Sequence, residues 1–507
     1  MNKIKKKLGE VFSGEGIFSS AATVAIIATV VVVNILLYII VSAFQLYFYQ
    51  TEAPNLEISG NTDTLFAPAI SKGQKVKIMF CMAEEDIEKD ETGTYVHETA
   101  KRFAKRYPDL IEIDYINLIT MQNQKLEFVD LSKYKNDMQG NENRIRRHSV
   151  IFESGENYRV VTDTYTSAGF APFFTINSER IALAYNGEEV MAAMISWVLA
   201  SEHKTVYFTQ YHGEIVDIEF SNLLASAGYY VDVIDLRNNE IPKDADLVII
   251  SSPTSDFEKA REGSGIRAEI DRLNTYMERG GNLYVALDPY VKKNMPVLYG
   301  FLENWGITLS TSKDSSGNTV NNIVKDYNNA ITTNGFTLVT NYANNDVAKK
   351  IRTRVEKYTG GDVVISMSAA LKLSADAKPL LLSSSSSVLE ADGETKSRSG
   401  SYCVAAYSEK SFNGETSRVF VIPSVYLAVT DSLISNGYSN KDFLYSLIED
   451  FYGGGMMPYG CKPILYDNQV LQNLTMGTAN IYTAIIMAIP VSILVCGAIV
   501  IVRRKNR

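Results

Sequence analysis

Two long apolar segments, one toward each end of the 507-residue chain, set the strongest limit on its fold. Residues 21–46 are dense in Val, Ile, Ala and Leu, and no charged residue occurs between Glu15 and Glu52. A helix rises about 1.5 Å per residue, so roughly 20 apolar residues cross the hydrocarbon core of a bilayer. A cleaved signal peptide has a shorter apolar stretch of about 7–15 residues. We therefore predict an uncleaved membrane helix at 21–46.

The second apolar segment spans residues 480–502 and contains Pro490, which membrane helices tolerate. The alternative is a buried core helix. The sequence given ends five residues later, which leaves no following segment to cover such a helix. We predict a second membrane helix here.

The charges beside the two segments predict their orientation. Four lysines precede the first segment, within residues 3–7, and four basic residues follow the second, within 503–507. Basic flanks stay on the cytoplasmic side of a membrane. We therefore expect both termini inside the cell and residues from about 47 to 479 outside the cytoplasmic membrane of a bacterium.

The outer part is acidic and has the composition of a globular protein. Of 49 basic and 58 acidic residues, the ends hold eight and two, which leaves a net charge of −15 between them. This charge argues against nucleic acid as a partner. Hydrophobic and charged residues make up 46% and 21% of the chain, which argues against a polytopic channel.

The first part of this region predicts a small α/β unit. Strands are expected at 75–80 and 111–116, a helix at 93–107 between them, and a closing hairpin at 149–161. Strand, helix, strand and hairpin is the order of a thioredoxin-like fold. The redox CxxC motif is absent, so the likeness is one of architecture.

A second α/β unit begins at residue 205. The apolar stretches 205–209, 230–236, 247–250, 283–287 and 417–424 predict strands, with helices in the intervals at 267–278 and 440–452. Alternation of strands and helices is typical of a mostly parallel sheet. Residues 310–400 are polar, and we predict loops and short strands there. The Ser383–Ser387 run follows three leucines, which favours a loop at a strand end.

The carboxyl edge of the second sheet is the best candidate for a ligand site, because open parallel sheets bind ligands just beyond their strand ends. The candidate ligand-binding residues expected there are His212, Gly213, Glu214, Ser251, Ser252, Asp288 and Ser424. His212 beside Glu214 is a possible proton-transfer pair. The alternative, which we favour, is a turn in which Gly213 takes a positive φ and the polar side chains cap the next helix.

The sequence lacks the motifs that several kinds of catalysis require. The sequence has no G-x-S-x-G elbow, no P-loop and no cysteine after the predicted strands of the second unit. None of its four histidines or four cysteines forms a pair with metal-ligand spacing. We therefore predict no catalytic residue, no metal, no cofactor and no ATP hydrolysis by this chain.

The ordered set of motifs resembles a known family. Residues 206–214 end in Tyr211-His212-Gly213-Glu214, and they are followed by an Asp-Ala-Asp strand start at 244–246, by Gly280-Gly281 and by Leu287-Asp288-Pro289. With an apolar segment at each end, this order is similar to the gliding-motility-type auxiliary components of ABC transporters, the GldG-like family. The family's signature has glycine where Tyr211 stands here.

The resemblance implies that the second unit is similar to class I glutamine amidotransferases, which have a flavodoxin-like sheet, without their catalytic cysteine. It also implies a separately encoded ABC ATPase and an ABC-2-type permease as partners. The predicted division of the chain is 1–20, basic terminus; 21–46, membrane helix; 47–74, linker; 75–200, thioredoxin-like domain; 203–452, amidotransferase-like domain with a polar insertion at 310–400; 453–479, linker; 480–502, membrane helix; 503–507, basic tail.

Three functions remain open on these grounds. The first is a non-catalytic auxiliary subunit of an ABC transporter, whose α/β ectodomain binds a substrate, an envelope component or a partner protein. The second is a membrane-anchored hydrolase or amidotransferase-like enzyme that acts on envelope glycans or peptides with His212 and Glu214. The third is a free-standing anchored ligand-binding protein.

Overall fold

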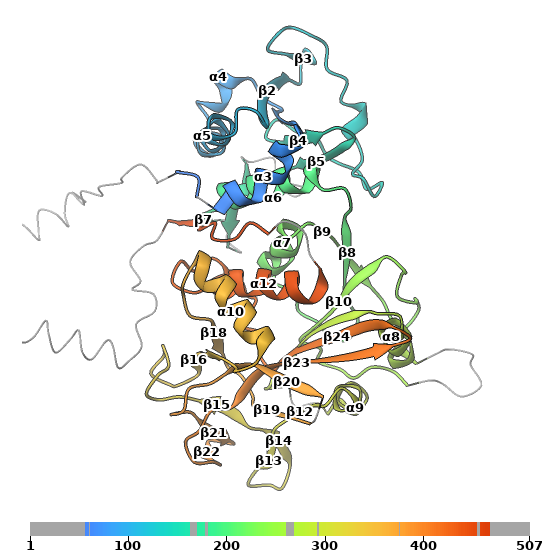
Figure 1. Cartoon of the computed structure of the whole chain (residues 1–507), viewed down its shortest axis with the longest axis vertical. Helices are drawn as coiled ribbons and strands as arrows, with labels where there is room; N and C mark the ends of the chain where they lie inside the picture. The colour runs from blue at the N-terminus through green and yellow to red at the C-terminus, as the bar shows by residue number, and fades with distance from the viewer. Residues whose placement is uncertain are drawn as a thin grey trace, which may run out of the picture. The chain divides into compact units, whose positions relative to one another are not determined.

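The computed structural model describes residues 56–59, 61–162, 170–177, 181–259, 268–291, 294–374, 376–453 and 457–466, which belong to one compact unit that starts at Leu56. The predicted membrane helices at 21–46 and 480–502 lie outside these ranges. Within the ranges, no helix combines the length and the hydrophobicity that a membrane crossing requires. The described chain is a mixed α/β fold (Figure 1).

The first part of the chain forms a five-stranded sheet in the order β3-β2-β1-β4-β5. β1 and β2 are parallel, and β4 and β5 are antiparallel to their neighbours. The predicted order of strand, helix, strand and hairpin is confirmed. The elements of this part are β1 (Val76–Phe80), α4 (Glu84–Ile87), α5 (Glu91–Arg106), β2 (Ile111–Asn117), β3 (Gln122–Asn123), the 3-10 helix η1 (Ser132–Tyr134), β4 (Val150–Ser154), β5 (Asn157–Val161), the 3-10 helix η2 (Ala171–Phe173), β6 (Phe174–Ile176), β7 (Ala182–Tyr185) and α6 (Gly187–Leu199).

Two segments that we predicted as linkers join this first core instead. Residues 61–71 form α3 (Asn61–Ser71), which buries Leu65 and Phe66 against the helices of the first part. Near the other end, β25 (Ile464–Leu465) pairs with β7. The spacing of Thr62, Leu65, Phe66 and Ala69 is that of a helix face, so the sequence did carry a signal for α3.

The second part is built on five parallel strands in the order β9-β8-β10-β11-β24. In chain order this is 2-1-3-4-5, the order of flavodoxin-like sheets. The elements that make and cover it are β8 (Lys204–Thr209), α7 (Ile218–Ser226), β9 (Tyr229–Ile234), β10 (Ala245–Ser251), α8 (Glu269–Glu278), β11 (Asn282–Ala286), α9 (Pro296–Asn304), β24 (Glu415–Ile422), α11 (Thr430–Leu433) and α12 (Asn440–Tyr452).

Both faces of these parallel strands are buried. Along β10, Leu247 and Ile249 face the core under α7 and α12, while Val248 and Ile250 face the core under α8 and α9. Successive residues of a strand point to opposite faces, so an uninterrupted apolar run suits a strand that is covered on both sides. The sequence prediction for 247–250 is therefore confirmed.

The sheet continues beyond β24 as antiparallel strands, which corrects the expectation of a mostly parallel sheet. Four of its strand pairings are parallel and five are antiparallel. Most of the added strands come from 310–400, so the prediction of short strands there is confirmed. The same stretch also forms the helix α10, which we did not predict. The elements are β12 (Ile307–Leu309), β13 (Thr311–Lys313), β14 (Thr319–Asn321), β15 (Ile323–Lys325), β16 (Thr337–Val339), β17 (Asn341–Tyr342), α10 (Asp346–Tyr358), β18 (Val364–Ser366), β19 (Leu371–Leu373), β20 (Ala377–Leu382), β21 (Val388–Ala391), β22 (Glu394–Thr395) and β23 (Cys403–Phe412).

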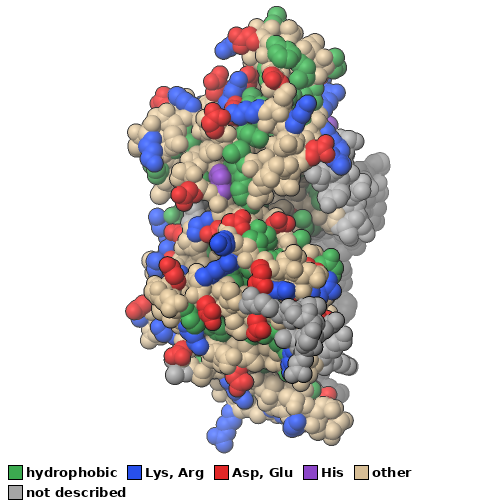
Figure 2. All heavy atoms as spheres, turned by 90° about the vertical axis from the view of Figure 1, so that its right-hand side faces the viewer, with side chains coloured by type: hydrophobic (Ala, Val, Ile, Leu, Met, Phe, Trp, Pro, Cys, Tyr) green, Lys and Arg blue, Asp and Glu red, His purple; other side chains and the backbone are tan. Residues whose placement is uncertain are grey.

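Surface charge is intermixed on the face shown in Figure 2, where Asp and Glu side chains lie among Lys and Arg. A protein that binds a nucleic-acid duplex gathers its basic side chains into a patch or stripe. That face has no such gathering. The absence of a nucleic-acid partner stays a prediction from the net charge.

The run Ser383–Ser387 follows β20, which confirms the prediction of a loop at a strand end. Its hydroxyl groups surround the carboxylate of Asp326, which is 1% exposed. Ser384, Ser386 and Ser387 donate to Asp326, the last two at 2.9 and 3.2 Å, and the backbone N–H groups of residues 328 and 329 donate at 2.9 Å. Burial alone raises the pKa of Asp326, but these donors outweigh it and lower the pKa.

We expect Asp326→Ala to destabilise the chain by about 3 kcal/mol, because three serine hydroxyls and two backbone donors then lack their acceptor. Urea unfolding of the full chain, followed by the fluorescence of the buried Trp197 and Trp305, measures the loss. Asp314→Ala is the matched control, since Asp314 also accepts backbone hydrogen bonds but lies in an exposed turn. Equal losses for the two variants contradict a structural role for the serine loop.

Candidate functional site

The topological switch point of the parallel sheet lies between β8 and β10, because the chain passes from β8 to β9 on one side and returns to β10 on the other. Ligands of open α/β sheets bind outside the carboxyl ends of the strands at this point. The loop that follows β8 carries His212 and Glu214, while Ser251 is the last residue of β10 and Ser252 directly follows it. The candidate residues thus lie at the edge where the sequence predicted them.

His212 lies between two buried carboxylates. Its Nδ1 is 2.9 Å from Oε1 of Glu214, and its Nε2 is 3.0 Å from Oε2 of Glu269. The three side chains are 3%, 3% and 1% exposed. The imidazole ring also stacks on Phe257, with ring centroids 4.2 Å apart. Both ring nitrogens therefore face acceptors.

The two carboxylates fix the charge of the ring. Burial alone lowers the pKa of His212, but its hydrogen bonds to Glu214 and Glu269 outweigh burial and raise the pKa to about 9. The same contact with His212 lowers the pKa of Glu214 in spite of burial. At neutral pH the ring is an imidazolium, both of whose N–H groups donate to carboxylates. Such a ring has no lone pair with which to accept a proton from a substrate.

The arrangement joins three segments of the chain at the switch point. Glu214 lies in the loop after β8, Phe257 in the loop after β10, and Glu269 in the first turn of α8. Oε2 of Glu269 also accepts from the backbone N–H of Glu258 at 2.5 Å. The cluster of His212, Glu214 and Glu269 is therefore a cross-link between strand-end loops.

The favoured interpretation of this turn holds in one respect and is wrong in another. Gly213 has a φ of +79°, and a Cβ atom there would meet Oγ1 of Thr254 at 2.0 Å, so glycine is required. The helix that follows is capped by neither His212 nor Glu214. Asp217 accepts the backbone N–H of Glu219 at 2.9 Å and caps α7.

The two serines at the end of β10 hold the same edge together. Oγ of Ser251 donates to the carbonyl of Ile215 at 2.6 Å, and the backbone N–H of Ile215 donates to Ser251 at 3.0 Å. Ser252 has a φ of +54°, and its N–H donates to the carbonyl of Ala286 at 2.8 Å. These contacts tie the loop after β8 to the loop after β10.

Asp288 and Ser424 lie at the same edge but bond within other loops. Asp288 follows β11 and accepts the N–H of Tyr290 at 2.9 Å. Ser424 follows β24 and donates to the carbonyl of Ser366 at 2.6 Å. Among the described residues, no hydrogen bond or ion pair joins them to His212, so the predicted residues share an edge without forming one cluster.

A groove of about 1190 Å³ opens beside Asp288 and its loop. Buried apolar side chains such as Leu287 and Leu371 line its floor, and Tyr290 and Tyr299 lie on its wall. Tyr290 is 47% exposed. The lining also includes many polar and charged side chains, such as Lys325 and Glu390, and the volume exceeds the usual 300–1,000 Å³ for small ligands.

The cysteines of the described part are unsuited to nucleophilic catalysis. Cys81, Cys403 and Cys461 form no disulfide there. Burial raises the pKa of the Cys81 thiol to about 12, and that of Cys403 to about 12. A thiol attacks as its thiolate, which these environments disfavour.

One group of potential metal ligands occurs within the described ranges. Glu84, Glu88 and His97 bring ligand atoms within 4.8 Å of one another. Nζ of Lys101 lies 3.1 Å from Glu84 and 3.3 Å from Glu88, and the ring of His97 also bonds to the hydroxyl of Tyr115. An ammonium group thus already balances these carboxylates.

Sequence reasoning missed Glu269 and Phe257, which complete the His212 cluster. Glu269 is 57 residues from His212 along the chain. An acidic residue in the first turn of a helix is common, so no local pattern marks this one as a histidine partner. Only the packing of α8 beside the switch point brings the two together.

Tyr211 occupies the position at which the GldG-like signature has glycine, and its φ is +82°. This left-handed conformation costs a residue with a Cβ roughly 1–2 kcal/mol. The exposed ring holds the guanidinium of Arg237 4.0 Å from its centroid. The position therefore favours glycine for a backbone reason, and the tyrosine offsets part of the strain with this contact.

No protein-family model and no curated protein matches it. Among solved structures, the mmIFT52 N-terminal domain is 16% identical over 48% of this chain and 96% of its own, with a TM-score of 0.36. PurLQS from Thermotoga maritima is 16% identical over 49% and 99%, with a TM-score of 0.29. A glutamine amidotransferase from Thermotoga maritima is 10% identical over 50% and 99%, with a TM-score of 0.26.

We expect the His212 cluster to make stability fall as pH rises. The folded chain keeps a proton on His212 up to pH about 9, whereas the unfolded chain loses it near 6.5. The stabilisation is complete below pH 6.5 and is lost as pH rises through 9, by roughly 3 kcal/mol at 1.36 kcal/mol per pKa unit. Urea unfolding of the full chain between pH 6 and 10 measures this slope.

In this experiment His212→Gln removes the slope, while the control His148→Gln keeps it, because His148 lies outside the cluster. A wild-type chain whose stability is flat between pH 6.5 and 9 contradicts a charged His212.

Glycine and alanine at position 211 separate backbone strain from the ring contact. Both Tyr211→Gly and Tyr211→Ala lose the contact with Arg237, but only alanine keeps the cost of the positive φ. We expect the glycine variant to be the more stable of the two by about 1 kcal/mol. Thermal unfolding of both variants side by side measures the difference. Equal melting temperatures argue against strain at this position.

Proposed function

We propose that the chain is a non-catalytic auxiliary subunit of an ABC transporter. It works with an ABC-2-type permease and a separate ATPase. Its folded part binds a substrate, an envelope component or a partner protein outside the cytoplasm, and the apolar segments 21–46 and 480–502 hold it in the cytoplasmic membrane. The family resemblance suggests these partners, and the geometry of the chain ends supports the anchoring.

The observation that carries the anchoring is that both ends of the folded part attach to the same short stretch of chain. The N–H of Ser59 donates to Glu188 at 2.6 Å, and β25 pairs with β7 just before this glutamate. A Cβ atom on Gly460 would meet the side-chain nitrogen of Asn61 at 2.1 Å, so the two ends touch (Figure 1). Neighbouring exits allow two helices that flank one domain to enter one bilayer, although the ends of folded domains often lie close together for other reasons as well.

The protonation of the ionisable groups at the switch point favours binding over catalysis. An imidazolium committed to Glu214 and Glu269 does not act as a general base, and the described thiols are protonated. The groove beside Asp288 remains open for a ligand at the same sheet edge. The proposed finer fold, a thioredoxin-like unit followed by an amidotransferase-like one, agrees with the two strand orders, 3-2-1-4-5 and, among the parallel strands, 9-8-10-11-24.

Affinity purification of the tagged full chain from gently solubilised native membranes tests the proposal. We expect an ABC-2-type permease and an ABC ATPase to co-purify in comparable amounts. As a matched control, replacing residues 480–502 with an unrelated membrane helix keeps the chain in the membrane but removes one packing surface, and we expect the yield of partners to fall. A chain that purifies alone contradicts the transporter role.

A further inference from the structure

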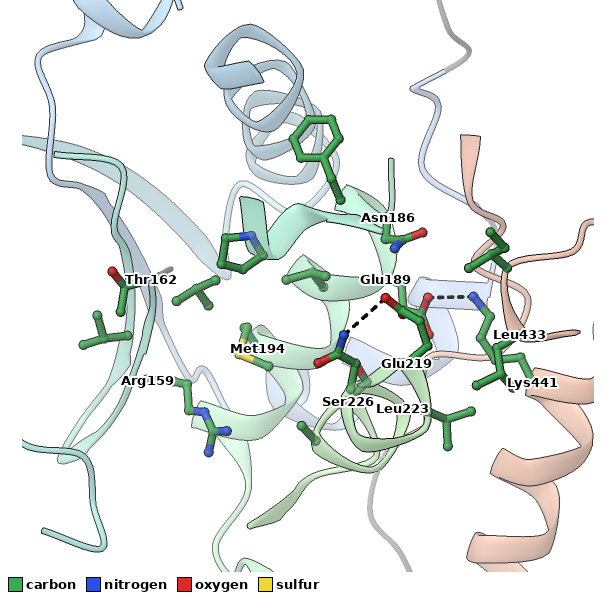
Figure 3. A pocket seen from close by; sticks show the side chains of 18 residues that line it. Arg159, Thr162, Asn186, Glu189, Met194, Glu219, Leu223, Ser226, Leu433 and Lys441 are labelled. Atoms are coloured by element: carbon green, nitrogen blue, oxygen red, sulfur yellow. Dashed lines mark hydrogen bonds and ion pairs between the residues drawn. The ribbon is translucent and has the colours of Figure 1, made fainter. Parts of the chain in front are cut away.

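A pocket of about 210 Å³ lies between the first sheet and the second. Its walls come from β5 and α6 on one side and from α7, α11 and α12 on the other (Figure 3). The volume corresponds to about seven water molecules at roughly 30 Å³ each. It suits a ligand below the usual size of drug-like molecules.

One end of the pocket has a cation without an anion. Arg159 lines this end, and its guanidinium lies 5.0 Å from the ring centroid of Trp197 and 5.7 Å from that of Tyr230. No carboxylate of the described chain forms an ion pair with it. Burial lowers the pKa of Arg159, as it does for a cation that lacks a partner. Arg159 is half-buried, and charges that are partly removed from water are normally paired, so this end of the pocket favours an anionic group.

The other end has a carboxyl group that forms no ion pair with a cation of the described residues. Glu219 lines the pocket from the first turn of α7, and Asn222 donates to its Oε1 at 3.4 Å. Burial, together with the charge of Glu189, raises the pKa of Glu219 to about 7. The nearby ammonium of Lys441 is occupied, since it contacts Glu189 at 2.6 Å and the carbonyl of Cys461 at 2.9 Å. This end therefore favours a cationic group.

The lining between the two ends combines apolar side chains with polar ones such as Asn186 and Ser226. Figure 3 shows Met194 between Arg159 on one side and Glu219 on the other, and the lining includes Val161, Val190, Pro172, Leu223 and Leu433. The pocket thus has a site for an anion at Arg159, a site for a cation at Glu219, and apolar side chains between them that small aliphatic groups can contact.

We propose that this pocket binds a short peptide of two or three small residues with both termini free. The terminal carboxylate forms the bidentate pair that a guanidinium favours, with Arg159. The terminal ammonium pairs with Glu219. A simple anion leaves Glu219 unpaired, and a simple amine leaves Arg159 unpaired. The inference is independent of the transporter role, because it rests on the pocket alone.

Isothermal titration calorimetry on the full chain with dialanine and trialanine tests the proposal. We expect binding by at least one of them. N-acetylation removes the ammonium and C-terminal amidation removes the carboxylate, and each change should weaken binding by about tenfold or more. Acetate and ethylammonium each probe one end only, and single alanine carries both charges on one residue; we expect all three to bind more weakly than the peptide.

Variants at the two ends of the pocket show which terminus of the peptide each residue contacts. Glu219→Gln should remove the effect of N-acetylation, and Arg159→Gln should remove the effect of amidation, because each contact is then already lost. Glu202→Gln and Arg352→Gln are the matched surface controls, and they should bind as the wild-type chain does. Ala225→Leu fills the pocket without removing a charge, so it should abolish binding in a chain that still folds.

Equal binding of the free and the capped peptides overturns the proposal, and so does undiminished binding to the Ala225→Leu variant. The absence of binding by both peptides at millimolar concentration also overturns it. The transporter role survives each of these outcomes, since co-purification measures it separately.

Discussion

The burial of both faces of the parallel strands is the constraint on which the second part of the molecule depends. Every side chain of 247–250 enters one of two cores, so this stretch of β10 carries no polar side chain. Polar chemistry is left to the loops at the strand ends, where backbone groups need partners in any case. This is why all the candidate residues lie at one sheet edge.

At the switch point, that edge is closed by its own side chains. Three ionisable groups, His212, Glu214 and Glu269, satisfy one another in a dry environment, and the serines at the end of β10 fix the neighbouring loop. A buried imidazolium costs free energy unless its donors are paired, and here both are paired. The same residue types that form an acid–base pair in an open cleft thus form a cross-link in a closed one.

The sequence predicted the strands better than the contacts between distant segments. Apolar runs such as 247–250 carry the strand signal locally, and parallel strands place their ends at one edge. The buried residues of α3 recur at helical spacing, but the stretch is polar and contains a proline, so the sequence favoured a linker there. The helix α10 has only three fully buried side chains, Ala348, Ile351 and Val355, in a charged stretch, so its pattern is weak.

The site depended on pairings that no local pattern encodes. Glu269 reaches His212 only because α8 packs beside the loop after β8. Arg159 and Glu219 come to one pocket because the first sheet and α7 pack together, 60 residues apart in the chain. Spacing in sequence predicts a shared helix face or strand edge, but it does not predict which surfaces of two separate sheets meet.

The helix α6 contacts both α/β parts, the start of the folded chain and one end of the pocket. Its Glu188 holds the start of the folded chain through Ser59, and its Glu189 holds α12 through Lys441 and Tyr445. Trp197 on the same helix supports Arg159 at one end of the pocket. A ligand in the pocket therefore contacts the element to which the chain ends and the second sheet are both attached.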